Sequence, residues 1–215
     1  MESKRSELLR ASPRMFENDL LDRFSRVHHY VPLVIFLPVI TVFLYLGFDG
    51  VGTGGTLLLA VGGYFFWSLS EYWIHRVIFH WEPEHGFGAK IHWMVHGVHH
   101  DHPNDPLRLV MPPGASIPLA TLFIVAFVVV IGAPDAWPFA GGFLAGYLIY
   151  DMIHFALHHH RPRTRFGRWL RELHMRHHFQ DDTAGFGIAA PYWDWIFRTK
   201  VDREKRATPA PREDS

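Results

Sequence analysis

Histidine is the residue type in this sequence whose number and spacing point most directly to chemistry. Ten of the 17 histidines fall into four closely spaced groups. Neutral imidazole is the commonest protein ligand for zinc, iron and copper. One ion rarely takes more than six protein ligands, so we expect a metal centre with more than one ion. The candidate ligands are His75, His80, His96, His99, His100, His154, His158, His174, His177 and His178.

Three of the four groups have the spacing of a single helix face. Residues 96–100 and 174–178 share the pattern His-x-x-His-His, and His154 precedes His158 by four positions. Side chains three or four apart lie on the same side of a helix, so each group can present two or three imidazoles to one place. His75 and His80 are five apart, about 140° around an ideal helix. They could therefore reach different ions, or the helix could be distorted between them.

Side chains near the candidate ligands could hold the imidazole rings in place. A ligating histidine usually donates its second ring N–H to a carboxylate or carbonyl. Glu71 lies four positions before His75, and Asp151 lies three before His154. His92 lies four before His96 and could share its face. We expect Glu71, Asp151 and His92 to be neighbours of the ligands.

Composition excludes several classes of protein. The sequence has no cysteine, which rules out disulfides, cysteine-type zinc sites and iron–sulfur clusters ligated by this chain. Its formal net charge is zero, so no overall field recruits nucleic acid, and we expect no nucleic-acid partner.

Four apolar blocks must position the histidines. Residues 31–47, 51–70, 114–134 and 136–150 carry no charged side chain. A bilayer core of about 30 Å needs roughly 20 apolar residues in a helix. Buried helices of a soluble protein are the alternative, but four such blocks in 215 residues argue against it. We predict an all-α integral membrane protein with four transmembrane helices, at about 31–48, 52–74, 114–133 and 136–157.

The basic residues predict the topology. All 21 Lys and Arg lie before residue 31, between 75 and 110, or after 160, and the two short connections have none. The positive-inside tendency then makes both termini and the middle segment cytoplasmic, with the helices in two hairpins. All ten candidate ligands then fall on the cytoplasmic side of the membrane. We expect this membrane to be a bacterial inner membrane or the endoplasmic reticulum. We assign 1–30 to a loose tail and interfacial helix, 31–206 to the membrane domain and 207–215 to a disordered tail.

The residues around the histidines carry a family resemblance. The runs EYWIHRVIFH, HGVHHDHPNDPLRLVMPP, GYLIYDMIHFALHH and ELHMRHHFQDDTAGFGIAAPYWDWIF span much of residues 64–199. They resemble the fatty acid hydroxylase/sterol desaturase superfamily, and within it the fatty acid 2-hydroxylase branch that acts on sphingolipid acyl chains. The stretches from Arg108 to Pro113, from Gly185 to Gly187, and Trp193-Asp194 are the more discriminating part of the match.

The resemblance implies a four-helix transmembrane bundle with a cytosolic helical cap holding a histidine-rich dimetal site. It also implies two iron ions on the ten histidines named above, although zinc could occupy the site in purified protein. Many eukaryotic members carry a cytochrome b5 domain that this sequence does not contain. We therefore expect a separate electron donor, either cytochrome b5-like or a ferredoxin with its reductase.

The function expected from this resemblance is hydroxylation of a lipid acyl chain by dioxygen, at the 2-position of a ceramide or related lipid. An alternative within the superfamily is oxidation of a sterol or carotenoid ring. An alternative of another class is a histidine-rich metal transporter. Transporters place ionisable groups near the bilayer midplane, whereas the four apolar blocks here have almost none.

Overall fold

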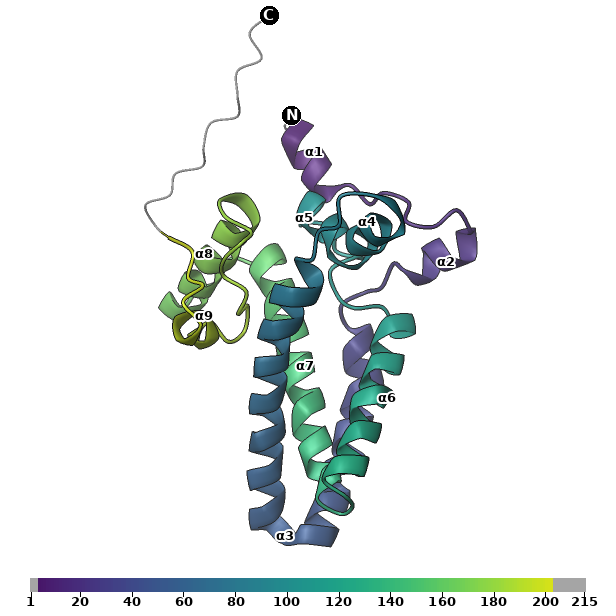
Figure 1. Ribbon diagram of the computed structural model, residues 1–215, viewed down its shortest axis with the longest axis vertical. Helices are drawn as coiled ribbons and strands as arrows, with labels where there is room; N and C mark the ends of the chain where they lie inside the picture. Colours follow the sequence, from purple (N-terminus) through teal and green to yellow (C-terminus); the bar gives the residue numbers. More distant parts are fainter. Residues whose placement is uncertain (1–3, 203–215) are drawn as a thin grey trace, which may run out of the picture.

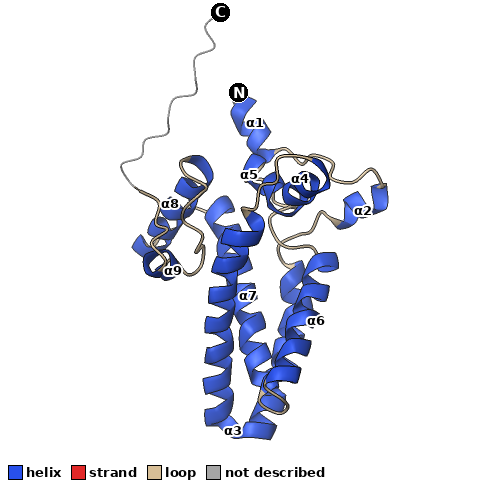
Figure 2. Ribbon diagram, in the orientation of Figure 1, coloured by secondary structure: helices blue, strands red, loops and turns tan. Residues whose placement is uncertain are grey.

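The computed structural model describes residues 4–202, and within them the chain is helical and contains no strand (Figure 2). Long helices form a bundle at one end, and short helices form a cap at the other (Figure 1). The elements are α1 Lys4–Arg10, α2 Asp19–Phe24, α3 Val31–Trp73, η1 Ile74–Phe79, α4 Gly86–His92, η2 Trp93–Gly97, α5 Val98–Asp101, α6 Pro113–Val130, α7 Ala136–His159, α8 Arg165–Phe179 and α9 Tyr192–Ile196, with η1 and η2 π-helical.

Helix α3 reverses its direction at Gly52. This residue has φ 71° and ψ 175°, a backbone conformation that glycine adopts without steric cost. A straight helix of 43 residues would be about 65 Å long, twice the thickness of a bilayer core. Figure 1 shows instead two arms that meet at the bottom of the bundle. Each arm has about the length that one membrane crossing requires.

Within residues 4–202, three helical stretches are long and apolar enough to cross a membrane: Val31–Phe79, which includes both arms of α3, Pro113–Val130 and Ala136–His159. The predicted spans therefore fall on helices, and the first two share one helix with a reversal. By length and composition, the chain is a membrane protein.

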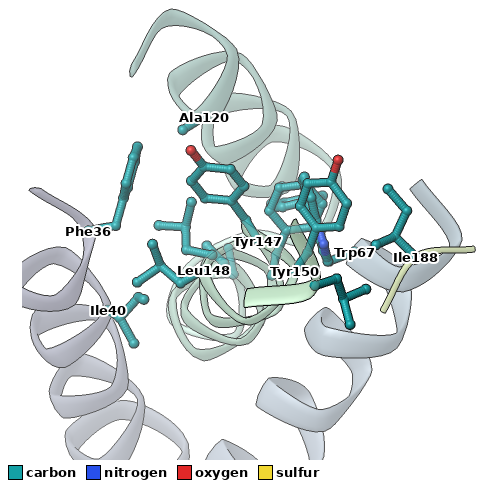
Figure 3. Close-up of a cluster of buried hydrophobic side chains, with 14 of the residues drawn as sticks. Phe36, Ile40, Trp67, Ala120, Tyr147, Leu148, Tyr150 and Ile188 are labelled. Atoms are coloured by element: carbon teal, nitrogen blue, oxygen red, sulfur yellow. The ribbon is translucent and has the colours of Figure 1, made fainter. Parts of the chain in front are cut away.

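Helix α7 is the centre of the bundle and packs closely on α3. A Cβ atom at Gly142 would overlap the carbonyl oxygen of Ala60, so only glycine permits this approach. Aromatic side chains fill the space nearer the cap, where Trp67 meets Tyr147 edge to face with 5.3 Å between ring centroids (Figure 3). This packing fixes the two helices that carry His75, His154 and His158 into the cap.

The N-terminal segment is docked on the cap. We expected a loose tail and an interfacial helix within residues 1–30, and α1 occupies Lys4–Arg10 of this segment. Its Leu9 carbonyl accepts a hydrogen bond from Asn104 N at 2.9 Å. After α2, Val27 N donates to the Leu107 carbonyl at 2.7 Å. The sequence pattern does not reveal this docking because the contacts join residues about 80 to 95 positions apart. The predicted tail at 207–215 lies outside the described residues.

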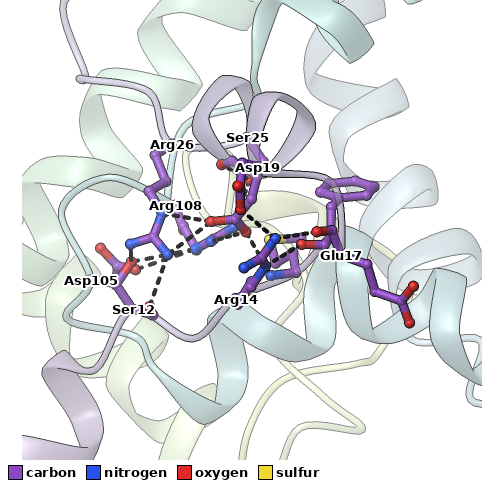
Figure 4. A network of polar contacts seen from close by, with 11 residues as sticks. Ser12, Arg14, Glu17, Asp19, Ser25, Arg26, Asp105 and Arg108 are labelled. Atoms are coloured by element: carbon purple, nitrogen blue, oxygen red, sulfur yellow. Dashed lines mark hydrogen bonds and ion pairs between the residues drawn. The ribbon is translucent and has the colours of Figure 1, made fainter.

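A buried ion-pair network reinforces the docking (Figure 4). The Arg108 side chain is 2% exposed and donates to Asp22 Oδ1 at 3.0 Å and to Ser25 Oγ at 2.8 Å. Asp105 lies 3.7 Å from the same guanidinium, and Arg26 also binds Asp22. These contacts connect α2 to the loop that follows the His-x-x-His-His segment of residues 96–100.

Candidate metal centre

The structure brings all ten predicted histidines together at the cap end of α3 and α7, in two groups of five. Within each group the nearest ligand atoms all lie within 4.8 Å of one another. Group 1 comprises His75, His80, His96, His100 and His177, and group 2 comprises His99, His154, His158, His174 and His178.

The π-helical segment η1 explains how His75 and His80 reach the same group. His80 N donates to the carbonyl of His75, five residues earlier, at 3.2 Å. This wider turn rotates the two side chains onto one face, and their Nε2 atoms lie 3.2 Å apart. Of the two possibilities that the sequence left open, the helix is distorted. Single π-turns inside α-helices are frequent at functional sites.

Each His-x-x-His-His segment is divided between the two groups. In residues 96–100, the outer pair His96 and His100 joins group 1, while His99 joins group 2. In residues 174–178, the outer pair joins group 2, while His177 joins group 1. The i,i+4 pair thus serves one group, and the residue between its members serves the other. Helix α7 completes group 2 with His154 and His158.

The nitrogen geometry fits a bound cation. His75 Nδ1 donates to the Phe186 carbonyl and His177 Nδ1 donates to the Ala184 carbonyl, both at 2.7 Å. The Nε2 atom of each neutral ring therefore carries a lone pair. Both lone pairs lie close to His80 Nε2, at 3.2 and 3.1 Å. One proton on His80 cannot satisfy both, whereas a metal ion bonded to all three nitrogens can.

The distances between ligand nitrogens in group 2 also fit a bound cation. His154 Nε2 lies 3.0 Å from His99 Nε2, and His174 Nε2 lies 2.7 Å from His158 Nε2 and 3.2 Å from His178 Nε2. Two nitrogens bonded to one ion at about 2.0–2.1 Å are about 2.9 Å apart at a right angle and about 3.4 Å apart at the tetrahedral angle. The observed separations lie close to this range.

Burial keeps the rings neutral, as metal ligation requires. Desolvation lowers the pKa of His96, His99 and His174 well below the ordinary value, and neighbouring histidines lower it further. The pKa of His80 falls to about 3, again mainly through desolvation. His80, His100 and His178 are only partly buried, so they mark the side of the centre that is open to other molecules.

Backbone carbonyls hold two of the ligand rings, and the three expected neighbours lie elsewhere around the centre. Glu71 Oε1 accepts from Ala189 N at 2.9 Å, so it supports the loop around residues 184–190. Asp151 is buried in α7 and belongs to neither group. His92 is half-buried on α4 and belongs to neither group. Backbone carbonyls of Ala184 and Phe186 hold the two group 1 rings instead.

Asp194 is a positioning residue: from the sequence it was noted as part of the family match and was assigned no role at the site. Its carboxylate accepts from Phe186 N and Gly187 N, both at 2.9 Å, and from Thr199 Oγ1 at 2.8 Å. It thereby fixes the loop whose carbonyls orient His75 and His177. The Gly-x-Gly stretch at 185–187 with an aspartate seven residues later was the available signal, because carboxylates commonly bind successive backbone N–H groups in turns.

Comparison with known proteins places this site in a family. The fatty acid hydroxylase family model matches residues 60–199. The chain is 35% identical over 193 residues to the dihydroceramide fatty acyl 2-hydroxylase FAH2 of Arabidopsis thaliana, covering 87% of this chain and 79% of the relative. It is 34% identical to the ceramide very long chain fatty acid hydroxylase SCS7 of Saccharomyces cerevisiae, covering 88% of this chain and 50% of the relative.

A solved structure has the same fold. The structure of full-length scs7p, in which only the hydroxylase domain is visible, superposes with a TM-score of 0.82 at 33% sequence identity. The superposition covers 90% of this chain and 74% of that chain.

Proposed function

Because this chain belongs to the fatty acid hydroxylase family, we propose that it hydroxylates the acyl chain of a ceramide-type membrane lipid at the 2-position. The relatives named as dihydroceramide and fatty acid 2-hydroxylases support this substrate and position. The observation that carries the proposal is the convergence of ten histidines in two groups at the end of apolar helices. The chain is thus a lipid-hydroxylating oxidoreductase.

Each five-histidine group would hold one iron ion. Iron bound there supplies the redox chemistry that activates dioxygen, which zinc lacks because it has no accessible redox change. The ten neutral imidazoles bind the ions, and the Ala184 and Phe186 carbonyls orient two of them. The buried rings of group 2, His99 and His174 among them, exclude water from one side of the centre.

The overall reaction needs electrons from outside. One C–H bond, one dioxygen molecule, two electrons and two protons give one C–OH group and one water. The described residues offer no redox group besides the proposed metal centre, and the sequence has no cysteine. We propose that a separate protein donates the electrons, either cytochrome b5-like or a ferredoxin with its reductase.

We propose that the two arms of α3 cross the membrane separately, which gives four spans in two hairpins with α6 and α7. The reversal at Gly52 and the absence of Lys and Arg from both short connections support this. Both termini and the metal centre would then be cytoplasmic, in a bacterial inner membrane or the endoplasmic reticulum. Residues 1–30 would form the cytoplasmic tail and interfacial helix, and 31–206 the membrane domain.

Lipid analysis of a host with and without the gene tests the function. Under aerobic, iron-replete growth with donor proteins present, we expect ceramides whose acyl chains gain one oxygen, with fragmentation placing it at carbon 2. Unchanged acyl chains, despite metal-loaded protein in the membrane, would contradict the proposal. Oxygen on a sterol or carotenoid ring would favour the other branch of the superfamily, and metal flux in proteoliposomes would favour a transporter.

A further inference from the structure

Tyr72, near the cap end of α3, is the largest fully buried side chain among the described residues. It lies three positions before the ligand His75. The ring of Phe186 meets both residues edge to face, with its centroid 6.1 Å from that of Tyr72 and 5.7 Å from that of His75. The Tyr72 hydroxyl contacts Thr199 Oγ1 at 2.9 Å. A phenol, which can give up one electron, is thus held two ring contacts away from a metal ligand.

The Tyr72 hydroxyl begins a chain of hydrogen bonds that ends on a carboxylate. Thr199 Oγ1 donates its one proton to Asp194 Oδ1 at 2.8 Å, so the Tyr72 hydroxyl is the donor to Thr199. Arg76 Nη1 donates to the same phenol oxygen at 3.0 Å and fixes the direction of the hydroxyl. Burial raises the pKa of Asp194 above its ordinary value, which favours uptake of a proton. The phenol proton can therefore move to Asp194 through Thr199.

Aromatic rings continue from Tyr72 to the surface of the protein. Trp73 contacts Tyr72 edge to face with 5.5 Å between the ring centroids. Phe197 stacks on Tyr72 at 4.9 Å and meets Trp73 at 5.1 Å. Trp73 is 41% exposed, and indole and phenol rings lose an electron more readily than any aliphatic side chain. These rings connect the buried phenol with a side chain that a reductant at the membrane surface can reach.

We propose that Tyr72 and Trp73 form a redox relay, which protects the metal centre when dioxygen reacts there without a lipid. This inference rests on the iron and dioxygen chemistry of the proposed function. An oxidant that removes hydrogen from an acyl C–H bond can also remove it from a phenol, because the phenol O–H bond is weaker. In each step Tyr72 gives one electron to the oxidant formed from dioxygen and its proton to Asp194, which leaves a neutral tyrosyl radical.

An external reductant closes the relay. The separate donor protein, or a small one-electron reductant such as ascorbate, supplies one electron through Trp73, and Asp194 returns the proton to the phenol of Tyr72. Two such rounds, with two protons from solvent, convert the oxygen atom that would have entered the lipid into water. The ligand histidines are then spared oxidation.

Electron paramagnetic resonance detects the tyrosyl radical directly. Protein in detergent is loaded with ferrous iron, given no lipid, mixed with dioxygen and frozen. We expect a radical signal in the wild type whose hyperfine splitting changes when the tyrosines carry deuterium on the ring. Tyr72→Phe should lose this signal at equal iron content, whereas the matched control Tyr45→Phe should keep it, since Tyr45 is 68% exposed and far along α3. No signal in the wild type, or a signal of wild-type size in Tyr72→Phe, would overturn the proposal.

Mass spectrometry of the wild type tests the outward half of the relay without any variant. The iron-loaded protein passes through repeated cycles of anaerobic reduction, removal of the reductant and exposure to dioxygen without lipid. We expect added oxygen first on Trp73. Trp81 and Trp195 are internal controls: at 61% and 62% exposed, they would be modified first by oxidants in solution. Oxidation of Trp81 and Trp195 with Trp73 intact would refute the relay, even if Tyr72→Phe had failed to fold.

The relay and the proposed function fail differently. Hydroxylated ceramide in the host, with no tyrosyl signal from the wild type, would remove the relay and leave the function intact. A tyrosyl signal that Tyr72→Phe abolishes, with no hydroxylated lipid in the host, would remove the proposed function and leave a protein whose iron centre oxidises Tyr72.

Discussion

Replacing Arg108 by methionine should loosen the N-terminal segment from the cap. Methionine keeps most of the length of the side chain and removes its charge and its donors. Asp22 and Asp105 would then stay in a buried setting without the guanidinium, at side-chain exposures of 12% and 3%. Removing one partner of a buried ion pair typically destabilises a protein by about 3–5 kcal/mol, because the remaining charge is uncompensated.

The structure favours the lower end of that range. Asp22 keeps the Arg26 guanidinium at 3.1 Å and the Met15 N–H at 2.7 Å. The Met15 hydrogen bond, followed by those from Arg108 and Arg26, holds the pKa of Asp22 well below its usual range although burial opposes this. A loss of about 3 kcal/mol corresponds to a decrease in Tm of roughly 6–12 °C for a chain of this size.

Thermal unfolding in detergent, followed by circular dichroism, measures this shift. Arg23→Met is the matched control, because Arg23 is exposed on α2, and we expect it to change stability by less than about 0.5 kcal/mol. The Asp22→Asn variant and the double variant complete a thermodynamic cycle. If Arg108→Met lowered Tm no more than the control did, or if the two changes were additive, the ion pair would not hold the segment in place.

Three further predictions concern the metal centre. His99→Ala removes one ligand from group 2, and His177→Ala removes one from group 1. Each variant should abolish hydroxylation and lower the metal-to-protein ratio measured by mass spectrometry, whereas His160→Ala should change neither. Full activity in a ligand variant would remove that residue from the ligand set. Asp194→Ala should reduce metal affinity about 10- to 100-fold by freeing the loop that orients two ligands, measured by competition with a chelator, and an unchanged affinity would exclude the positioning role. In metal-free protein, burial holds the pKa of His99 well below its unfolded value of about 6.5. This ring therefore contributes stability that is present above pH 6.5 and lost as the pH falls below it, so the Tm of metal-free protein should decrease between pH 7 and pH 5. A Tm that is independent of pH in this range would contradict the prediction.

Helical periodicity made the ten ligands predictable. Their division into group 1 and group 2 depends on the backbone geometry of the packed helices. Spacing alone brought residues 96–100 and 174–178 to faces that could meet. It could not assign His99 and His177 to the opposite groups, because this depends on how the helices are rotated against each other. It also could not place His80 beside His75, since the π-turn between them departs from ideal helix geometry.

The supporting contacts were harder to foresee than the ligands. Glu71 and Asp151 had suitable spacing on their own helices, yet the two rings with a fixed Nδ1 bond in group 1 donate to carbonyls of the 184–186 loop. Likewise, Arg108 belongs to a family-like stretch, but its partner Asp22 lies 86 positions away. Local patterns predict which faces are apolar or rich in histidine, whereas pairing between distant segments emerges only from the packed fold.

The crossed division of the two His-x-x-His-His segments has a consequence for how the centre fills. Under the proposed occupancy of one ion per group, each segment is tethered to both ions, so the first ion to bind orders three rings that the second ion needs, one on one segment and two on the other. Uptake should therefore be positively cooperative, and a half-loaded protein should be scarce at any free metal concentration. Native mass spectrometry during a titration would then detect mainly empty and doubly loaded chains, as in an all-or-none assembly.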